Sequence, residues 1–210
     1  MRKNRIIFAT GNEGKMREIR EILKDLGMEV LSMKEAGIVL DIEENGQTFG
    51  ENAEIKARAV WNQTGEIVLA DDSGLVVDCL GGEPGIYSAR YMGEDTSYEL
   101  KNQTILNRAA CFSGTERSTR FICNIAAVLP DGLVLHTEAA MEGLLADKPS
   151  GNEGFGYDPI LYIPEFQMTA AELTMEQKNK ISHRGKALEA MKEKLKERFG
   201  EENHESSDCQ

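Results

Sequence analysis

The sequence predicts a mixed fold of strands and helices, built as one domain or as two lobes that share a sheet. Its 210 residues, 40% of them hydrophobic, are enough to bury a substantial core. Segments with the period of a strand and segments with the period of a helix follow one another along the chain. Nothing in the sequence suggests a tandem array, so we expect an ordinary globular chain.

Several classes of function are disfavoured by composition. The longest apolar runs, such as residues 6–9 and 125–129, are far short of the roughly 20 residues that span a bilayer. The basic start of the chain is followed by too little apolar sequence for a signal peptide, so we expect a cytoplasmic protein. A formal net charge of −12 opposes binding to nucleic acid or to an anionic membrane. A small phosphorylated ligand stays possible where cations are concentrated locally.

The cysteines and the end of the chain predict no chemistry. The four cysteines form no CxxC pair, and we expect them to be reduced and structural. Residues 201–210 hold four acids and no Lys or Arg, which predicts a disordered acidic tail after a folded region at residues 1–200.

The first candidate site follows a strand predicted at residues 5–10 and precedes a helix predicted at residues 14–26, with Gly27 at its end. A strand, a glycine-containing turn and a helix N-terminus together favour phosphate, because free N–H groups and the helix dipole face the anion. The spacing is not that of a Walker A loop, and an ordinary turn with a surface lysine is the alternative. The candidate residues are Thr10, Gly11, Asn12, Glu13, Gly14 and Lys15.

An acidic loop at residues 41–46 precedes a helix predicted from Thr48 to about residue 62. The helix start is indicated by the Thr-x-x-Glu spacing of a capping box at residues 48–51. Acids ahead of a helix are usually solvated or complement its dipole. Glu43 or Glu44 could instead supply a second carboxylate to a metal.

The strongest metal candidate is the segment at residues 70–74, Ala-Asp-Asp-Ser-Gly, predicted as a turn between two buried strands. Two buried acids are costly unless a cation or a donor meets them. Adjacent side chains on an extended chain point to opposite faces, so Asp71 and Asp72 need not do the same job. The alternative is an ordinary polar turn.

The middle of the chain is expected to be mostly scaffold. A strand at residues 75–80 leads into a glycine-rich loop of unusual path at residues 81–91, where Arg90 could meet a phosphate or an acid. A capping box at residues 96–99 opens a helix to about residue 110. Strands at 121–129 and 133–141 then flank Pro-Asp-Gly and predict a hairpin.

The last part of the chain carries a second candidate site. Glycines alternate with aromatics at residues 151–159, which suits a ring-shaped ligand stacked on Phe155 or Tyr157. A capping box at residues 169–172 opens a helix that carries Lys178 and Lys180. His183 and Arg184 open a final helix that Gly200 is expected to stop, and cations gain nothing from the dipole at that end. Their placement suggests a ligand, and the commoner alternative is an ordinary surface pair.

The combination and order of these motifs resemble the inosine triphosphate pyrophosphatase family. The resemblance spans about residues 5–199, with no departure at the motif positions. Six blocks carry it: Thr10-Gly11-Asn12-x-x-Lys15, Thr48-Phe49-x-Glu51-Asn52-Ala53, Ala70-Asp71-Asp72-Ser73-Gly74-Leu75, Gly82-x-Pro84-Gly85-x-Tyr87-Ser88-Ala89-Arg90, Gly154-Phe155-Gly156-Tyr157-Asp158-Pro159 and Ser182-His183-Arg184.

The resemblance implies an α/β fold with a long mixed β-sheet, flanking helices and two lobes around a central nucleotide cleft, assembled as a homodimer. It implies hydrolysis of ITP, dITP or XTP to the monophosphate and pyrophosphate, which would keep deaminated purines out of nucleic acids. Residues 10–15 would hold the triphosphate, and Glu43 and Asp72 would hold Mg²⁺. The residues implied to contact substrate, base and sugar are Ser73, Phe155, Gly156, Tyr157, Asp158, Lys178, His183 and Arg184.

The residues themselves are compatible with this chemistry. Mg²⁺ prefers one or two carboxylates together with waters and phosphate oxygens, as a small acidic cluster would provide. The family pattern makes Asp72 the proton acceptor, but a metal-bound carboxylate is a weaker base, so Asp71 or a glutamate of the acidic loop stays a possible partner. Two other functions are a hydrolase for other modified nucleotides and a nucleotide-binding regulator, which would be expected to have lost the acids.

Overall fold

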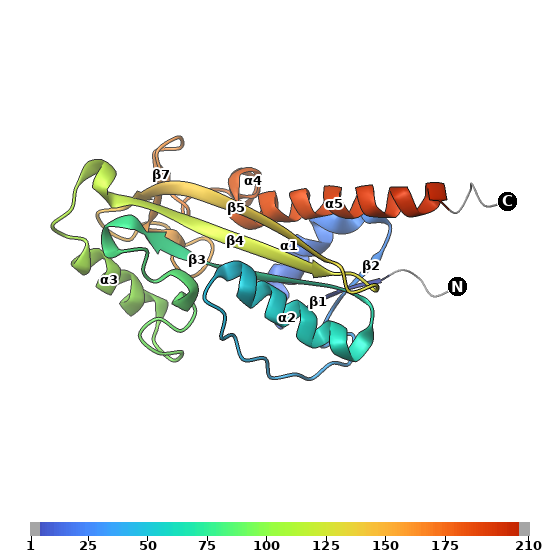
Figure 1. Ribbon diagram of the computed structural model, residues 1–210. Coiled ribbons are helices and arrows are strands. Elements are labelled where there is room, and N and C mark those ends of the chain that lie inside the picture. The colour runs from blue at the N-terminus through green and yellow to red at the C-terminus, as the bar shows by residue number, and fades with distance from the viewer. Residues whose placement is uncertain (1–4, 206–210) are drawn as a thin grey trace. The chain divides into compact units, whose positions relative to one another are not determined.

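The computed structural model describes residues 5–205, without the side chains of residues 13, 14 and 200–205. It confirms an α/β fold with a mixed seven-stranded sheet in the order β2-β1-β3-β4-β5-β6-β7 (Figure 1). The chain divides into two units. Unit 1 comprises the described parts of residues 1–72, 124–138 and 185–210, and unit 2 comprises residues 73–123 and 139–184.

Unit 1 contains three parallel strand segments, together with residues 124–138 of the long hairpin. β1 (Arg5–Phe8) pairs in parallel with β2 (Glu29–Ser32) and with the start of β3 (Ile67–Val77), in the register Ile6 to Val30 and Ile6 to Ile67. Its helices are α1 (Glu13–Leu23), α2 (Phe49–Thr64) and nearly all of α5 (His183–Glu205). A 3₁₀ turn, Lys24–Leu26, ends at Gly27, whose φ of 65° is the left-handed conformation that glycine adopts freely.

Helices cover both faces of the unit 1 strands, which explains their continuous hydrophobic runs. α2 packs on one face through Ala53, Ala57 and Val60, which meet Ile7 and Val68 of the sheet. On the opposite face α5 lies beside α1, and the Lys192 ammonium donates to the Ile22 carbonyl (Figure 1). The fully buried apolar residues of α1 and α5 are Met16, Ile19, Leu23, Leu188, Met191 and Leu195.

Unit 2 contains the remaining parts of the three longest strands. It holds the last part of β3, the first part of β4 (Ser118–Val128) and the end of β5 (Val134–Leu145), followed by antiparallel β6 (Leu161–Ile163) and β7 (Met168–Thr169). Its helices are α3 (Tyr98–Arg108) and α4 (Met175–Ile181), with short 3₁₀ turns at Asp78–Leu80, Gly85–Tyr87, Gly114–Arg117 and Asp158–Ile160. Leu75, Ile105, Phe121, Met141 and Leu161 are among the side chains of its core.

The segment at residues 70–74 is not a turn, contrary to the sequence-based prediction. β3 runs without a break from Ile67 to Val77 and continues into a 3₁₀ turn rather than a strand at residues 78–80. The polar residues stay extended because partners on the neighbouring elements satisfy their side chains, so the tertiary contacts override the turn propensity. The predicted hairpin is confirmed, with strands longer than expected.

Two of the three predicted capping boxes are displaced. Thr48 caps α2 as predicted and accepts from the Glu51 N–H at 3.1 Å. The cap of α3 is Ser97 rather than Thr96, whose hydroxyl instead donates to the Met92 carbonyl.

The third predicted box, at Thr169 and Glu172, closes a turn after β7 instead of opening a helix. α4 begins later, with a reciprocal box between Thr174 and Gln177. The prediction was wrong because the same spacing occurs twice within nine residues, and the first copy is used by a strand end.

The last helix extends further than predicted. α5 continues past Gly200 to Glu205, so the predicted stop at Gly200 is wrong, and the predicted tail begins inside a helix. A glycine within a helix costs only about 1 kcal/mol, which does not by itself end one. Residues 206–210 of that tail lie outside the described residues. Among residues 5–205, no helix combines the length and the apolar character needed to cross a bilayer.

Candidate functional site

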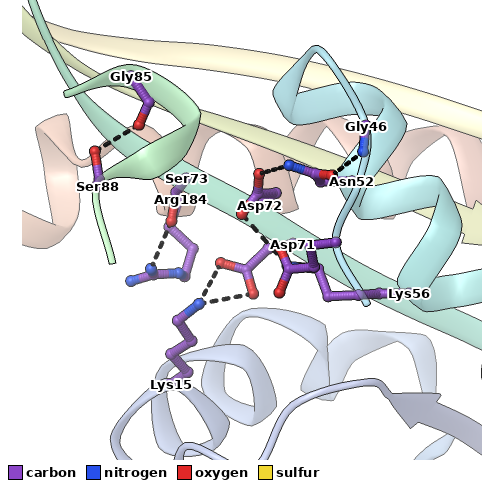
Figure 2. Close-up of polar contacts among 11 residues, drawn as sticks. Lys15, Gly46, Asn52, Lys56, Asp71, Asp72, Ser73, Gly85, Ser88 and Arg184 are labelled. Atoms are coloured by element: carbon purple, nitrogen blue, oxygen red, sulfur yellow. Dashed lines mark hydrogen bonds and ion pairs between the residues drawn. The ribbon is translucent and has the colours of Figure 1, made fainter. Parts of the chain in front are cut away.

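Asp71 and Asp72 point to opposite faces of β3, as the period-two alternation of a strand predicts. The Asp71 carboxylate accepts from the Lys15 ammonium through both oxygens, at 2.9 and 3.1 Å, on the face that carries α1. The Asp72 carboxylate accepts from Asn52 at 3.2 Å and from Lys56 at 3.3 Å, both on α2 (Figure 2). The two neighbouring acids therefore belong to separate polar clusters.

The predicted phosphate loop is a well-formed helix start. The Asn12 side chain accepts from the Lys15 N–H at 3.1 Å, which caps α1, and the Thr10 hydroxyl accepts from the Asn12 N–H at 3.2 Å. Gly11 and Asn12 are exposed, while the side chains of residues 13 and 14 lie outside the description. Lys15 is thus the cation of this loop, and its ammonium lies on Asp71.

Lys56 joins two carboxylates of unit 1. Its ammonium donates to Glu44 at 3.0 Å and to Asp72 at 3.3 Å. We call Glu44, Lys56 and Asp72 the Asp72 cluster. Two acids share one cation there, so the cluster carries a formal charge of −1.

Burial acts on the groups of this cluster. It raises the pKa of Asp72 above its ordinary value, because desolvation disfavours the carboxylate, while Lys56 opposes that change and Glu44 adds to it. The pKa of Lys56 is also raised, although burial pulls it down, because Asp72, Asp71 and Glu44 all stabilise the ammonium. An acid with a raised pKa is a better proton acceptor.

The geometry favours Glu44 over Glu43 as the neighbour of Asp72. Glu43 is exposed, whereas Glu44 reaches the same ammonium as Asp72. Within residues 5–205, no three His, Cys, Asp or Glu side chains gather to form a metal site by themselves. Two carboxylates converging on one cation fit Mg²⁺, which takes its other ligands from water and phosphate.

In unit 2, Ser73 and Arg184 meet side by side. The guanidinium of Arg184, 5% exposed, donates to the Ser73 hydroxyl at 3.4 Å (Figure 2). Next to them, Gly74 permits a close backbone approach, because a Cβ there would lie 2.4 Å from the Ser88 hydroxyl. That hydroxyl accepts from the Leu75 N–H and donates to the Gly85 carbonyl, which ties the glycine-rich loop to β3.

The second predicted site contains a buried ion pair. The Asp158 carboxylate accepts from the Lys178 ammonium at 2.6 Å and from the Phe155 N–H at 2.8 Å. We call Phe155, Asp158 and Lys178 the Asp158 cluster. A Cβ on Gly154 would lie 2.3 Å from Asp158, so this position needs glycine. The Phe155 ring is 60% exposed, with the Lys178 ammonium 5.5 Å from its centroid.

Tyr157 is a core residue, which leaves Phe155 as the aromatic of this loop that presents a free face. The Tyr157 ring is 3% exposed and packs edge-on against Tyr98 at 5.2 Å, and its hydroxyl donates to the Ser88 carbonyl. Burial strongly raises the pKa of Tyr157, which stays protonated. Gly156 is fixed from α3, since the Asn102 amide donates to its carbonyl at 3.1 Å.

His183 is stacked on Phe121 with centroids 5.0 Å apart, and only 8% of it is exposed. The structure thus brings His183, Arg184 and Ser73 into unit 2, and Asp72, Glu44 and Lys15 into unit 1. Sequence reasoning missed Lys56 and the role of Asn52. Both could have been recognised from the sequence, because Asn52 and Lys56 are polar residues four apart on the predicted helix, next to the alanines of its apolar face.

The sequence and the fold of this chain both match known proteins. A model of the Ham1 family matches residues 6–194. The curated dITP/XTP pyrophosphatase of Clostridium perfringens is 48% identical over 91% of this chain and 97% of the relative, and that of Bacillus subtilis is 44% identical over 90% and 96%. The solved Ham1 protein of Staphylococcus aureus superposes with a TM-score of 0.85 and 40% identity, over 92% of this chain and 99% of its own.

Proposed function

The chain belongs to the Ham1 family, and from that premise we propose that it hydrolyses the deaminated purine triphosphates ITP, dITP and XTP to monophosphate and pyrophosphate. The observation that carries the proposal is the match to curated dITP/XTP pyrophosphatases along nearly their whole length. The polar clusters of the two units support it, because they offer acids and cations for a triphosphate and donors for a base.

Residues of unit 1 would act on the phosphates. Lys15 and the N-terminus of α1 would bind the triphosphate, since an ammonium and free N–H groups both favour anions. Asp72 and Glu44 would hold Mg²⁺, which when bound would neutralise charge on the phosphate oxygens. Glu44 takes the place of Glu43 in this proposal because it shares Lys56 with Asp72.

Asp72 would accept the proton of the water that attacks the α-phosphorus. One of its oxygens accepts a hydrogen bond from Asn52, which orients the carboxylate. Asp71 is the weaker candidate base, because both of its oxygens accept from Lys15 and its side chain is 1% exposed. The pyrophosphate would leave as the bond to the α-phosphorus breaks.

Residues of unit 2 would recognise the base. Hypoxanthine and xanthine present an acceptor oxygen at the six position, whereas adenine presents an amino donor, so donors on Arg184 or His183 would pair only with the oxo bases. Phe155 would stack on the ring, while Asp158 and Lys178 would fix its loop. An unpaired buried donor costs about 1–3 kcal/mol, roughly a 5- to 150-fold preference per contact.

The test is a panel of nucleoside triphosphates with Mg²⁺, in which pyrophosphate and orthophosphate are followed separately. We expect pyrophosphate from ITP, dITP and XTP and little product from ATP. Successive release of orthophosphate would instead identify a phosphatase and contradict attack at the α-phosphorus. Assembly as a homodimer and a cytoplasmic location accompany this proposal as predictions, to be tested by sedimentation and by cell fractionation.

A further inference from the structure

We propose that Asn52 is a positioning residue that sets the two carboxylates of the Asp72 cluster at once, one directly and one through the backbone of the acidic loop. This inference rests on the proposed function, because that function supplies the metal that the two carboxylates would hold. Asn52 is the fourth residue of α2 and is completely buried. Its amide joins two segments that are 26 residues apart, since 72 − 46 = 26: Gly46 in the loop and Asp72 in β3.

The orientation of the Asn52 amide follows from its partners. The Gly46 N–H can only donate, so the atom 2.8 Å from it is the oxygen of Asn52. An ionised Asp72 can only accept, so the atom 3.2 Å from its second oxygen is the amide nitrogen. Asparagine is the side chain of this length that accepts on one side and donates on the other.

The loop is built to reach this amide. A Cβ at Gly46 would lie 2.7 Å from the Asn52 oxygen and 2.8 Å from the Glu51 Cβ, so only glycine brings the backbone this close. Fixing the Gly46 N–H fixes the end of the acidic loop, and Glu44 lies two residues before it. Glu44 reaches Lys56 from there, on the same ammonium as Asp72.

The start of α2 does not need Asn52 for capping. Thr48 accepts from the Glu51 N–H, and Glu51 accepts from the Gln47 N–H, so other side chains satisfy this helix end. Both contacts of Asn52 run outward, to a loop and to a strand. Groups that orient metal ligands in this way typically affect metal affinity 10- to 100-fold when they are removed.

The test uses the full chain without nucleotide, with Mn²⁺ as the probe followed by electron paramagnetic resonance. Asn52→Ala and the milder Asn52→Ser remove the donor, and we expect them to weaken Mn²⁺ binding about 10- to 100-fold. Asn124→Ala is the matched control, because Asn124 is a buried asparagine of unit 1 whose amide also donates to an acid, Glu138. It should leave Mn²⁺ binding within about twofold.

Amide hydrogen exchange at Gly46 gives a readout that needs no metal. Asn52→Ala should speed that exchange, whereas Asn52→Asp, which keeps an acceptor for the Gly46 N–H, should preserve its protection. A folded Asn52→Ser that binds Mn²⁺ as the unchanged chain does, unaltered exchange at Gly46 in Asn52→Ala, or no Mn²⁺ binding by the unchanged chain would each overturn the proposal. If the proposed function itself is wrong, the panel of nucleoside triphosphates shows this separately, because ITP, dITP and XTP would then yield no pyrophosphate.

Discussion

The Asp72 cluster and the Asp158 cluster each set a lysine against a buried acid, but their charges differ. In unit 2, Asp158 has one cation, Lys178, and a backbone donor from its own loop, so the cluster is neutral. In unit 1, Lys56 is shared by Asp72 and Glu44, so these three side chains together carry a formal charge of −1. A balanced buried pair holds a loop in place, whereas an excess of carboxylate attracts a further cation.

The largest effect is expected from removing the charge of Asp72. Asp72→Asn keeps the side-chain volume but removes a metal ligand and a proton acceptor, so kcat for ITP should fall about 10²- to 10⁴-fold with nucleotide binding still measurable. Asp78→Asn, which disturbs only a surface pair with Arg120, is the control. A near-normal kcat for Asp72→Asn would show that the Asp72 cluster does not have the catalytic role that distinguishes it from the Asp158 cluster.

Arg184→Ala should narrow base selectivity. If its guanidinium donates to the six-position oxygen of the base, kcat/KM falls for ITP far more than for ATP. The ratio of kcat/KM for ITP to kcat/KM for ATP then shrinks about 5- to 150-fold. The Mg²⁺ concentration that gives half-maximal activity should stay the same, since Arg184 belongs to unit 2 and the proposed metal ligands belong to unit 1. An equal fall in kcat/KM for ITP and ATP would mean that Arg184 contacts the phosphates, or that it supports the structure through its hydrogen bond to Ser73.

Lys15→Ala should weaken binding of every triphosphate alike, because a phosphate contact carries no information about the base. The expected loss is about 10- to 100-fold, the size of a charge-assisted hydrogen bond. Arg17→Ala, an exposed cation on the same helix, serves as control. Calorimetric titration with non-hydrolysable ITP and ATP analogues measures it, and a loss that depends on the base would remove Lys15 from the phosphate site.

Breaking the balanced pair should act on stability. Lys178→Met leaves Asp158 buried with only the Phe155 N–H, and we expect a loss of about 1–3 kcal/mol in the free energy of unfolding, discounted for the partial exposure of Lys178. Lys180→Met, on the same helix in an exposed pair with Glu176, should change it by less than about 0.5 kcal/mol. Urea unfolding of both variants decides whether the pair stabilises its loop.

The smallest effect concerns the pH dependence of stability without metal. Because the pKa of Asp72 is raised on folding, the native state binds more protons than the unfolded chain between the ordinary and the raised pKa. This contribution is present below the ordinary aspartate pKa and is lost as pH rises through the raised one.

Asp72→Asn should therefore gain stability relative to the unchanged chain as pH is raised from below the ordinary aspartate pKa to above the raised one. Thermal unfolding at matched pH values tests the sign. A gain that appears on acidification instead would mean that the Asp72 carboxylate is stabilised by folding, as a balanced pair would be.

The positions proposed to carry the chemistry were all selected from the sequence. The acidic pair in β3, the helix start at Lys15 and the final His-Arg pair stand out there as polar residues beside apolar strands and helices. The divergence of Asp71 and Asp72 could also be predicted, because alternation is a local property of an extended backbone. Helix starts were less certain. Two threonine-glutamate spacings proved to belong to a turn or to lie one residue away from the true cap.

Partners across the fold were decided by the tertiary structure alone. The residue pattern left Glu43 and Glu44 open and the family resemblance implied Glu43, whereas the packing of α2 against β3 sets Lys56 between Glu44 and Asp72. Likewise Tyr157 and Phe155 look alike in the loop, until the core of unit 2 buries one ring and leaves the other exposed. The sequence by itself determined which residues are available and to which side of a strand each points, because those properties depend on near neighbours. Which carboxylate meets which cation depends on contacts between segments tens of residues apart, and these exist only in the folded chain.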